Sequence, residues 1–175
     1  FQLDIADTAL LATSSLIRNV LFFNRNNPKF NLQVGTQNNQ QKQVITSGFE
    51  SRKQLEYFLQ SRWNMGRQLN AQVKITTAER NNDSERFQNR DYQLQQLSIE
   101  PQLTWLPSQQ FRSILIYKYL NSKNQIGIEQ FNSQDLNLEM TYNRTTTTAI
   151  RLNTSYILAN FQGDANTPIA FTMLN

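Results

Sequence analysis

The chain lacks most of the side chains from which catalytic and metal sites are built. It contains no His and no Cys, so the common nucleophile–base pairs and the usual zinc sites cannot form. A pair of carboxylates could serve glycoside hydrolysis, but no motif sets two of the candidates in register. The carboxylates in question are Glu50, Glu56, Glu100, Glu129, Asp135 and Glu139. With only five Gly there is no Gly-rich phosphate loop either, so we expect a protein that is not an enzyme and has no cofactor.

Two oxygen-rich segments and one group of cations are the remaining candidates for ligand binding. Residues 82–85 and 164–166 offer oxygen ligands for Ca²⁺, but neither reaches the ligand number of a calcium loop, so we predict no metal site. The cations are Arg52, Lys53, Arg62, Arg67 and Lys74. They would favour anionic or sugar ligands if they lined a lumen, or they simply balance nearby carboxylates. The net charge of +4 is small and scattered, so no nucleic-acid partner is expected.

These cations belong to the clearest pattern in the chain, over residues 51–77. From Leu55 to Met65 the odd positions are mostly apolar and the even positions polar, and the alternation resumes after Gly66. Side chains of a strand alternate between its faces, so each segment has one apolar and one polar face. Both segments are about twice as long as ordinary strands, and the short turn makes them antiparallel neighbours. Long, alternating, paired strands are typical of transmembrane β-barrels.

The same alternation predicts an all-β, antiparallel up-and-down meander, an outer-membrane β-barrel or part of one. Further strands are expected at residues 14–23, 30–35, 92–105, 111–120, 135–142 and 150–158, and residues 44–49 are expected to lead into the strand that begins near residue 51. Polar loops are expected at residues 37–43, 79–91 and 121–134, the last with a small strand near 126–128, and a further segment begins at residue 169. For the N-terminal region, a helix capped by Asp7 and Thr8 is the alternative to a strand.

The strand at residues 92–105 has two irregularities. Its apolar positions change phase between Leu94 and Leu97, and one extra residue near Gln95 and Gln96 would cause this, so we predict a β-bulge there. Pro101 lies inside the same strand, although proline cannot donate to a strand ladder.

Loop lengths and aromatic positions favour a barrel. The predicted breaks near residues 66, 108 and 144 are short and those near 85, 127 and 165 longer, in strict alternation, as outer-membrane barrels require. Aromatic residues lie near both ends of the strands, where the interfacial girdles of a barrel would be. The predicted interfacial aromatics are Trp63, Trp105, Phe111 and Tyr142 near the short turns, and Tyr117 and Tyr119 toward the long loops, where Tyr57, Tyr92 and Phe161 also lie.

In this interpretation the apolar faces meet lipid. The predicted lipid-facing residues are Leu55, Tyr57, Leu59, Trp63, Leu69, Val73, Ile75, Leu136, Leu138, Met140, Leu152 and Leu158. No run of eighteen apolar residues occurs, so a membrane-spanning helix is not expected. The alternative is a soluble antiparallel sandwich or jelly roll of a surface protein that binds carbohydrate or protein, whose apolar face would meet a second sheet.

Three stretches of the sequence resemble large surface proteins of Bacteroidetes-type bacteria. They are residues 16–28, 48–52 and 160–174, the last with the core Gly-Asp-Ala-Asn-Thr-Pro at residues 163–168. In that family the last stretch lies near the C-terminus and is followed by further strands ending in an aromatic residue, which resembles the closing strand of an outer-membrane barrel. The family has no established activity, so the resemblance implies an architecture and a location but no catalytic residues.

The resemblance and the first residue, Phe1 rather than Met, together set the expected domain organisation. We expect residues 1–175 to be a single all-β barrel domain and a fragment of a longer chain. The expected location is the bacterial outer membrane or cell surface, and the expected partners are the lipid bilayer and other outer-membrane or surface proteins. The expected role is transport, secretion or surface anchoring.

Overall fold

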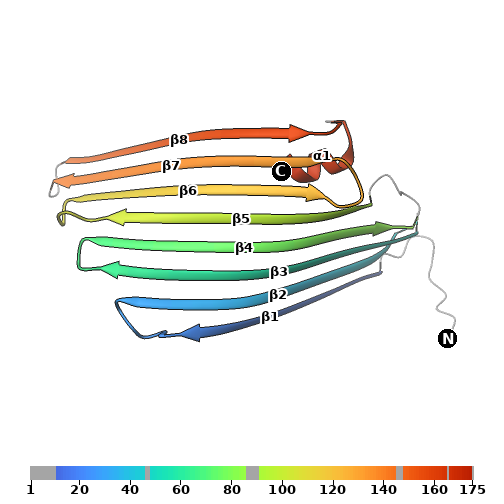
Figure 1. Cartoon of the computed structure of the whole chain (residues 1–175), viewed down its shortest axis with the longest axis horizontal. Coiled ribbons are helices and arrows are strands. Elements are labelled where there is room, and N and C mark those ends of the chain that lie inside the picture. Colours follow the sequence, from blue (N-terminus) through green and yellow to red (C-terminus); the bar gives the residue numbers. More distant parts are fainter. Residues whose placement is uncertain (1–10, 46–47, 86–90, 145–147, 165, 175) are drawn as a thin grey trace.

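The computed structural model describes residues 11–45, 48–85, 91–144, 148–164 and 166–174. Within these residues, eight strands form one antiparallel sheet whose strand order follows the sequence (Figure 1). The strands are β1 (Leu11–Phe23), β2 (Phe30–Ile45), β3 (Gly48–Met65), β4 (Leu69–Ser84), β5 (Tyr92–Trp105), β6 (Phe111–Asn124), β7 (Gln130–Arg144) and β8 (Thr148–Gln162). A short helix, α1 (Pro168–Leu174), follows β8. The predicted all-β antiparallel meander is therefore confirmed.

The sheet is not closed into a barrel. Each strand pairs with its neighbours in sequence, and among the described strands β1 pairs only with β2 and β8 only with β7. β1 and β8 are therefore the two edges of an open sheet (Figure 1), and both keep a row of backbone groups without a strand partner. The expected closure is not present in this sheet, because no register joins β1 to β8.

The central hairpin has the predicted form. β3 and β4 are antiparallel, with Leu59 opposite Ile75 and Met65 opposite Leu69. Residues 66–68 make the turn. Gly66 adopts a φ of 77°, a left-handed conformation that residues with a Cβ atom rarely adopt. The alternation of residues 51–77 therefore maps onto two paired strands.

Several strands are longer than predicted. Residues 37–43, expected as a loop, lie inside β2, and residues 79–84 lie inside β4. Likewise β6 continues to Asn124 and β7 begins at Gln130, so only residues 125–129 connect them and no strand forms at 126–128. The predictions failed here because these strand ends are polar on both faces and show no apolar alternation.

The predicted β-bulge is wrong. β5 runs beside β4 without an extra residue, with Gln95 opposite Glu79 and Gln96 opposite Ala78. The apolar pattern changes phase because Leu94 points to the opposite face of the sheet from Leu97, where it packs under α1. Pro101 stays within β5, opposite Val73 of β4, while the pairing of β5 with β6 is interrupted at residues 100–101. The missing N–H of proline accounts for that interruption.

The strict alternation of short and long connections is not observed. The β2–β3 connection comprises only residues 46–47, although it lies at the same end of the sheet as the β4–β5 connection at 85–91. The connections at 106–110 and 125–129 are equal in length. We call the end with residues 66–68 and 106–110 the short-turn end, and the opposite end the long-loop end.

At the two ends of the chain, the strand preferred for residues 14–23 is confirmed as β1, whereas Asp7 and Thr8 lie outside the described residues. The segment after residue 168 is the helix α1. Thr167 caps it, because its hydroxyl oxygen accepts a hydrogen bond from the Ala170 amide at 3.2 Å. α1 lies at the long-loop end (Figure 1), and its Ile169 and Met173 form a small buried cluster with Leu94 of β5 and Phe131 of β7.

Candidate functional site: the apolar face of the sheet

The register brings apolar residues from all eight strands together on one face, which we call the apolar face. Val34 of β2 lies opposite Leu59 of β3, which lies opposite Ile75 of β4, and similar rows continue to β8. One complete row reads Leu21, Val34, Leu59, Ile75, Ile99, Tyr119, Gln134 and Leu158. Because antiparallel partners project to the same side of a sheet, a single surface results.

This apolar face is a band that does not extend along the whole length of the strands. It covers residues 17–23, 30–34, 55–65, 69–77, 97–105, 111–119, 136–142 and 150–158 of β1 to β8. Beyond it, toward the long-loop end, the same face carries polar residues such as Lys53, Asn81 and Lys123. Most of these ranges approach the roughly 9–11 residues that a tilted strand needs to cross a bilayer.

All twelve predicted lipid-facing residues lie on this face. They are Leu55, Tyr57, Leu59, Trp63, Leu69, Val73, Ile75, Leu136, Leu138, Met140, Leu152 and Leu158. Large apolar side chains stay exposed, including Leu59 at 37%, Leu136 at 42% and Leu158 at 52%. A polar interruption, Ser61, is buried and donates its hydroxyl to the backbone oxygen of Asn31 at 3.4 Å. Ser61 therefore leaves no free hydroxyl on the apolar face.

Sequence reasoning missed part of this surface. β1, β2 and β5 also contribute, through residues such as Leu21, Leu32 and Leu103. In β5 the alternation of Leu97, Ile99 and Leu103 is visible in the sequence. It was not used to assign a face, because the change of phase after Leu94 was attributed to a β-bulge. In β1 the alternation is hidden, since Leu16, Val20 and Phe22 make the opposite face apolar as well.

Aromatic side chains gather at the short-turn end of the apolar face. Trp63 stacks on Phe30 with ring centroids 6.0 Å apart, and Trp105 meets Phe111 edge-on at 5.9 Å. Tyr142 lies opposite Phe111 in the β6–β7 register. Four of the predicted interfacial aromatics, on β3, β5, β6 and β7, are thus brought to one edge of the band.

The aromatics expected at the other edge divide between the two faces. Tyr117 and Tyr119 lie on the apolar face, within the band of β6. Tyr92 and Phe161 lie on the opposite face and pack against the cluster under α1, so their assignment to the long-loop girdle is wrong. They were misplaced because sequence position along a strand does not reveal which face packs against a later helix.

The opposite face, which we call the polar face, holds most of the charged and amide side chains. Gln60 and Gln72 lie on it, and Gln60 accepts a hydrogen bond from Gln33 at 2.8 Å. Of the cations singled out in the sequence, Arg52, Arg62 and Lys74 lie on the polar face, whereas Lys53 projects to the other face and Arg67 lies in the β3–β4 turn. The structure therefore places on different faces, or in a turn, cations that the sequence analysis treated as one group.

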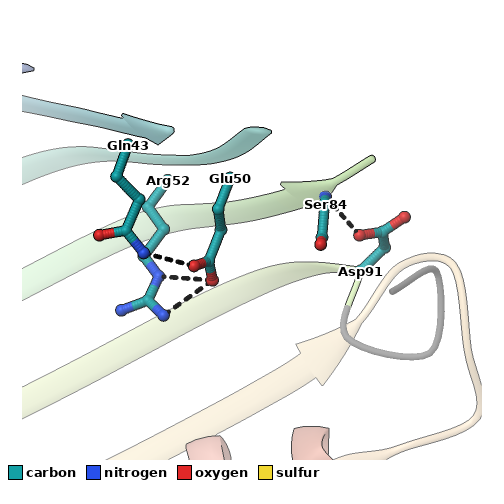
Figure 2. A network of polar contacts seen from close by, with 5 residues as sticks. All are labelled: Gln43, Glu50, Arg52, Ser84 and Asp91. Atoms are coloured by element: carbon teal, nitrogen blue, oxygen red, sulfur yellow. Dashed lines mark hydrogen bonds and ion pairs between the residues drawn. The ribbon is translucent and has the colours of Figure 1, made fainter. Parts of the chain in front are cut away.

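At the long-loop end the polar face is ordered by a hydrogen-bonded network (Figure 2). Glu50 is 9% exposed; its carboxylate accepts from Gln43 Nε2 at 2.6 Å and from Arg52 Nη2 at 2.9 Å. Nearby, Asp91 accepts a hydrogen bond from the Ser84 amide at 2.8 Å. The Gln43 contact ties β2 to β3, and the Asp91 contact ties the end of β4 to the residue before β5.

The two segments considered as calcium candidates take other roles in the fold. The described ranges contain no group of three or more acidic residues that could hold a metal ion. Asp164 instead shapes the turn before α1, accepting from the Asn166 amide and the Thr167 hydroxyl, both at 2.9 Å. Residues 82–84 belong to β4 rather than to a loop. In the described part of the chain, no helix is long and apolar enough to cross a membrane.

Comparison with family models, with curated proteins and with solved structures gives no match for this chain.

Proposed function

We propose that this chain forms part of the lipid-facing wall of an outer-membrane β-barrel protein with a role in transport, secretion or surface anchoring. The observation that supports it best is the band itself, which is exposed, in register over eight strands, and bounded by polar residues toward the long-loop end. Monomeric soluble proteins rarely expose contiguous apolar patches larger than a few hundred Å². A bilayer would cover this surface, and the polar face would then line the lumen.

A soluble sandwich would need a second sheet over the same band. All strands in the described ranges belong to the one sheet, so none of them covers the apolar face. The positions of Trp63 and Trp105 also support the membrane role. Both lie at the short-turn edge of the apolar face, which would meet the lipid headgroups, and aromatic residues are enriched at that depth. We therefore rank the membrane role above the sandwich.

The two tryptophans provide a direct test, because the chain has no others. The chain is refolded into liposomes whose lipids are brominated either near the headgroups or near the chain ends, and tryptophan fluorescence is recorded. We expect headgroup-proximal bromines to quench Trp63 and Trp105 strongly and chain-end bromines to quench them weakly.

A control variant moves the reporter to the middle of the band. Leu59→Trp in a Trp63→Phe, Trp105→Phe background should reverse the pattern, with the strongest quenching by deep bromines, because Leu59 lies about 20 Å along β3 from the turn. Fluorescence that neither lipid quenches, in either protein, would refute the membrane proposal.

A further inference from the structure

The polar face has a hollow at its long-loop end, beside the network of Figure 2. It measures about 220 Å³, below the roughly 300–1,000 Å³ of sites for drug-sized ligands. The side chains that define it on this face are Asn39, Gln41, Arg52, Gln54, Arg80 and Tyr92. They come from four adjacent strands, β2 to β5.

The strand register makes these side chains immediate neighbours. Gln41 lies opposite Arg52, and Gln54 lies between Asn39 and Arg80 in one row across β2, β3 and β4. Tyr92 begins β5 at the rim of the hollow and packs against the cluster under α1. The site is thus built on paired strands, with one wall held by the helix.

Two guanidinium groups make the hollow electropositive. The Nε of Arg80 is buried and has no hydrogen-bond partner among the described residues. Arg52 uses Nε and Nη2 for Glu50, but its side chain is 59% exposed. No Asp or Glu lines the hollow. Because guanidinium groups bind carboxylates through paired charge-assisted hydrogen bonds, an anionic oxygen group is the ligand feature they fit.

The other lining groups suit a sugar ring. The amides of Asn39, Gln41 and Gln54 each offer both donors and an acceptor, which matches hydroxyl groups. The ring of Tyr92 presents an apolar face with a polar tip. We propose that this hollow binds an acidic sugar, one carbohydrate unit bearing a carboxylate, with Arg80 and Arg52 on the carboxylate and the amides on the hydroxyls.

The site goes beyond the membrane role, since it depends only on the polar face. The test is isothermal titration calorimetry on the full chain in detergent, with sodium glucuronate, glucose and inorganic phosphate as probes. Glucuronate is expected to bind about tenfold or more tightly than glucose or phosphate. Arg80→Gln and Arg52→Gln should each weaken glucuronate binding about tenfold. Arg52→Gln removes an exposed side chain, so this variant is expected to fold even if Arg80→Gln does not.

Arg62→Gln is the matched control, because it removes the same charge from the same face of β3, about 33 Å farther along the strand. Its glucuronate affinity should stay within about twofold of the original, since it lies outside the hollow. The proposal is overturned if glucose or phosphate binds as tightly as glucuronate, if Arg52→Gln binds normally, or if Arg62→Gln weakens binding equally. If the chain binds glucuronate but its tryptophan fluorescence is not quenched in brominated liposomes, the sugar site is supported and the membrane role is refuted.

Discussion

Leu59 and Met65 lie on the same face of β3 but at different distances from the turn at residues 66–68. In a bilayer the penalty for a charge depends on depth, so the two positions should respond differently. We expect Leu59→Arg to lower the free energy of unfolding in liposomes by about 2–4 kcal/mol and Met65→Arg by about 0–1 kcal/mol. Urea titrations monitored by fluorescence would measure both.

Gln60→Arg is the matched control for face, because Gln60 lies between these positions on the polar face. There an arginine stays hydrated, so little change is expected. Equal losses at positions 59, 60 and 65 would contradict the membrane proposal, because neither face nor depth would then matter.

Gly35 makes room for an aromatic ring on the polar face. Phe58, directly opposite in β3, is 5% exposed, and the Arg18 guanidinium lies over its ring at 5.4 Å. A Cβ at Gly35 would overlap the Phe58 ring and lie 2.7 Å from the Asn19 backbone oxygen. We expect Gly35→Ala to lower the free energy of unfolding by about 1–3 kcal/mol, measured by denaturant titration.

The double variant Gly35→Ala, Phe58→Leu tests the cause. If the ring is the main obstacle, the two changes together should destabilise the sheet less than the sum of the single changes. Strict additivity would show that the ring and the glycine act independently, against this explanation.

At the scale of the strand, the sequence predicts some strand segments well and others not at all. Residues 55–65 of β3 alternate because one face is apolar, and their pairing with β4 was correctly predicted. Residues 37–43 of β2 are polar on both faces, so nothing in their pattern separates a strand from a loop. Leu94 looked out of phase because it packs on a helix more than seventy residues later, a contact that no local pattern contains.

The candidate site followed the same rule. Clean alternation identified the apolar-face residues of β3, β4, β7 and β8, whereas the proximity of Arg52 to Arg80, which lies opposite Gln54, depends on the strand register. Register at this end of the sheet could not be read from a segment that was itself expected to be a loop.

The helix α1 is the element whose attachment can be tested separately from the sheet. Met173 is 4% exposed in the cluster with Leu94 and Phe131. Met173→Asn places a side-chain amide in the apolar cluster without a hydrogen-bond partner, which destabilises the packing of α1. We therefore expect the backbone amides of α1 to lose most of their hydrogen-exchange protection, while those of β3 and β4 keep theirs. Ile128→Asn, at an 83% exposed position, is the control and should change neither. Loss of protection throughout the sheet would contradict a local role for α1.

At the scale of the whole molecule, the open edges are the main hazard. β1 is exposed and apolar on both faces, and β8 is exposed along nearly its whole length. Long, exposed, apolar edge strands promote pairing between chains. Without detergent we expect the chain to self-associate, as measured by size-exclusion chromatography with light scattering. A monodisperse monomer in plain buffer would contradict this expectation and weaken the membrane proposal.

Charges on the polar side of both edges should reduce that association. Leu16 and Ile157 project to the polar face of β1 and β8 and are 62% and 61% exposed. The double variant Leu16→Lys, Ile157→Lys should shift the chain toward smaller species while leaving liposome insertion intact, because the apolar band is unchanged.

The sequential strand order also determines how the sheet can assemble. Among the described strands, every pairing joins two strands that are consecutive along the chain, so these strands can pair without bringing distant segments together. Closing short loops has a small entropic cost, and sheets of neighbouring hairpins have lower contact order than Greek-key sandwiches. Each strand can therefore pair with the free edge of the strand before it. If assembly stops at any strand, the smaller sheet formed so far already has its native strand pairings.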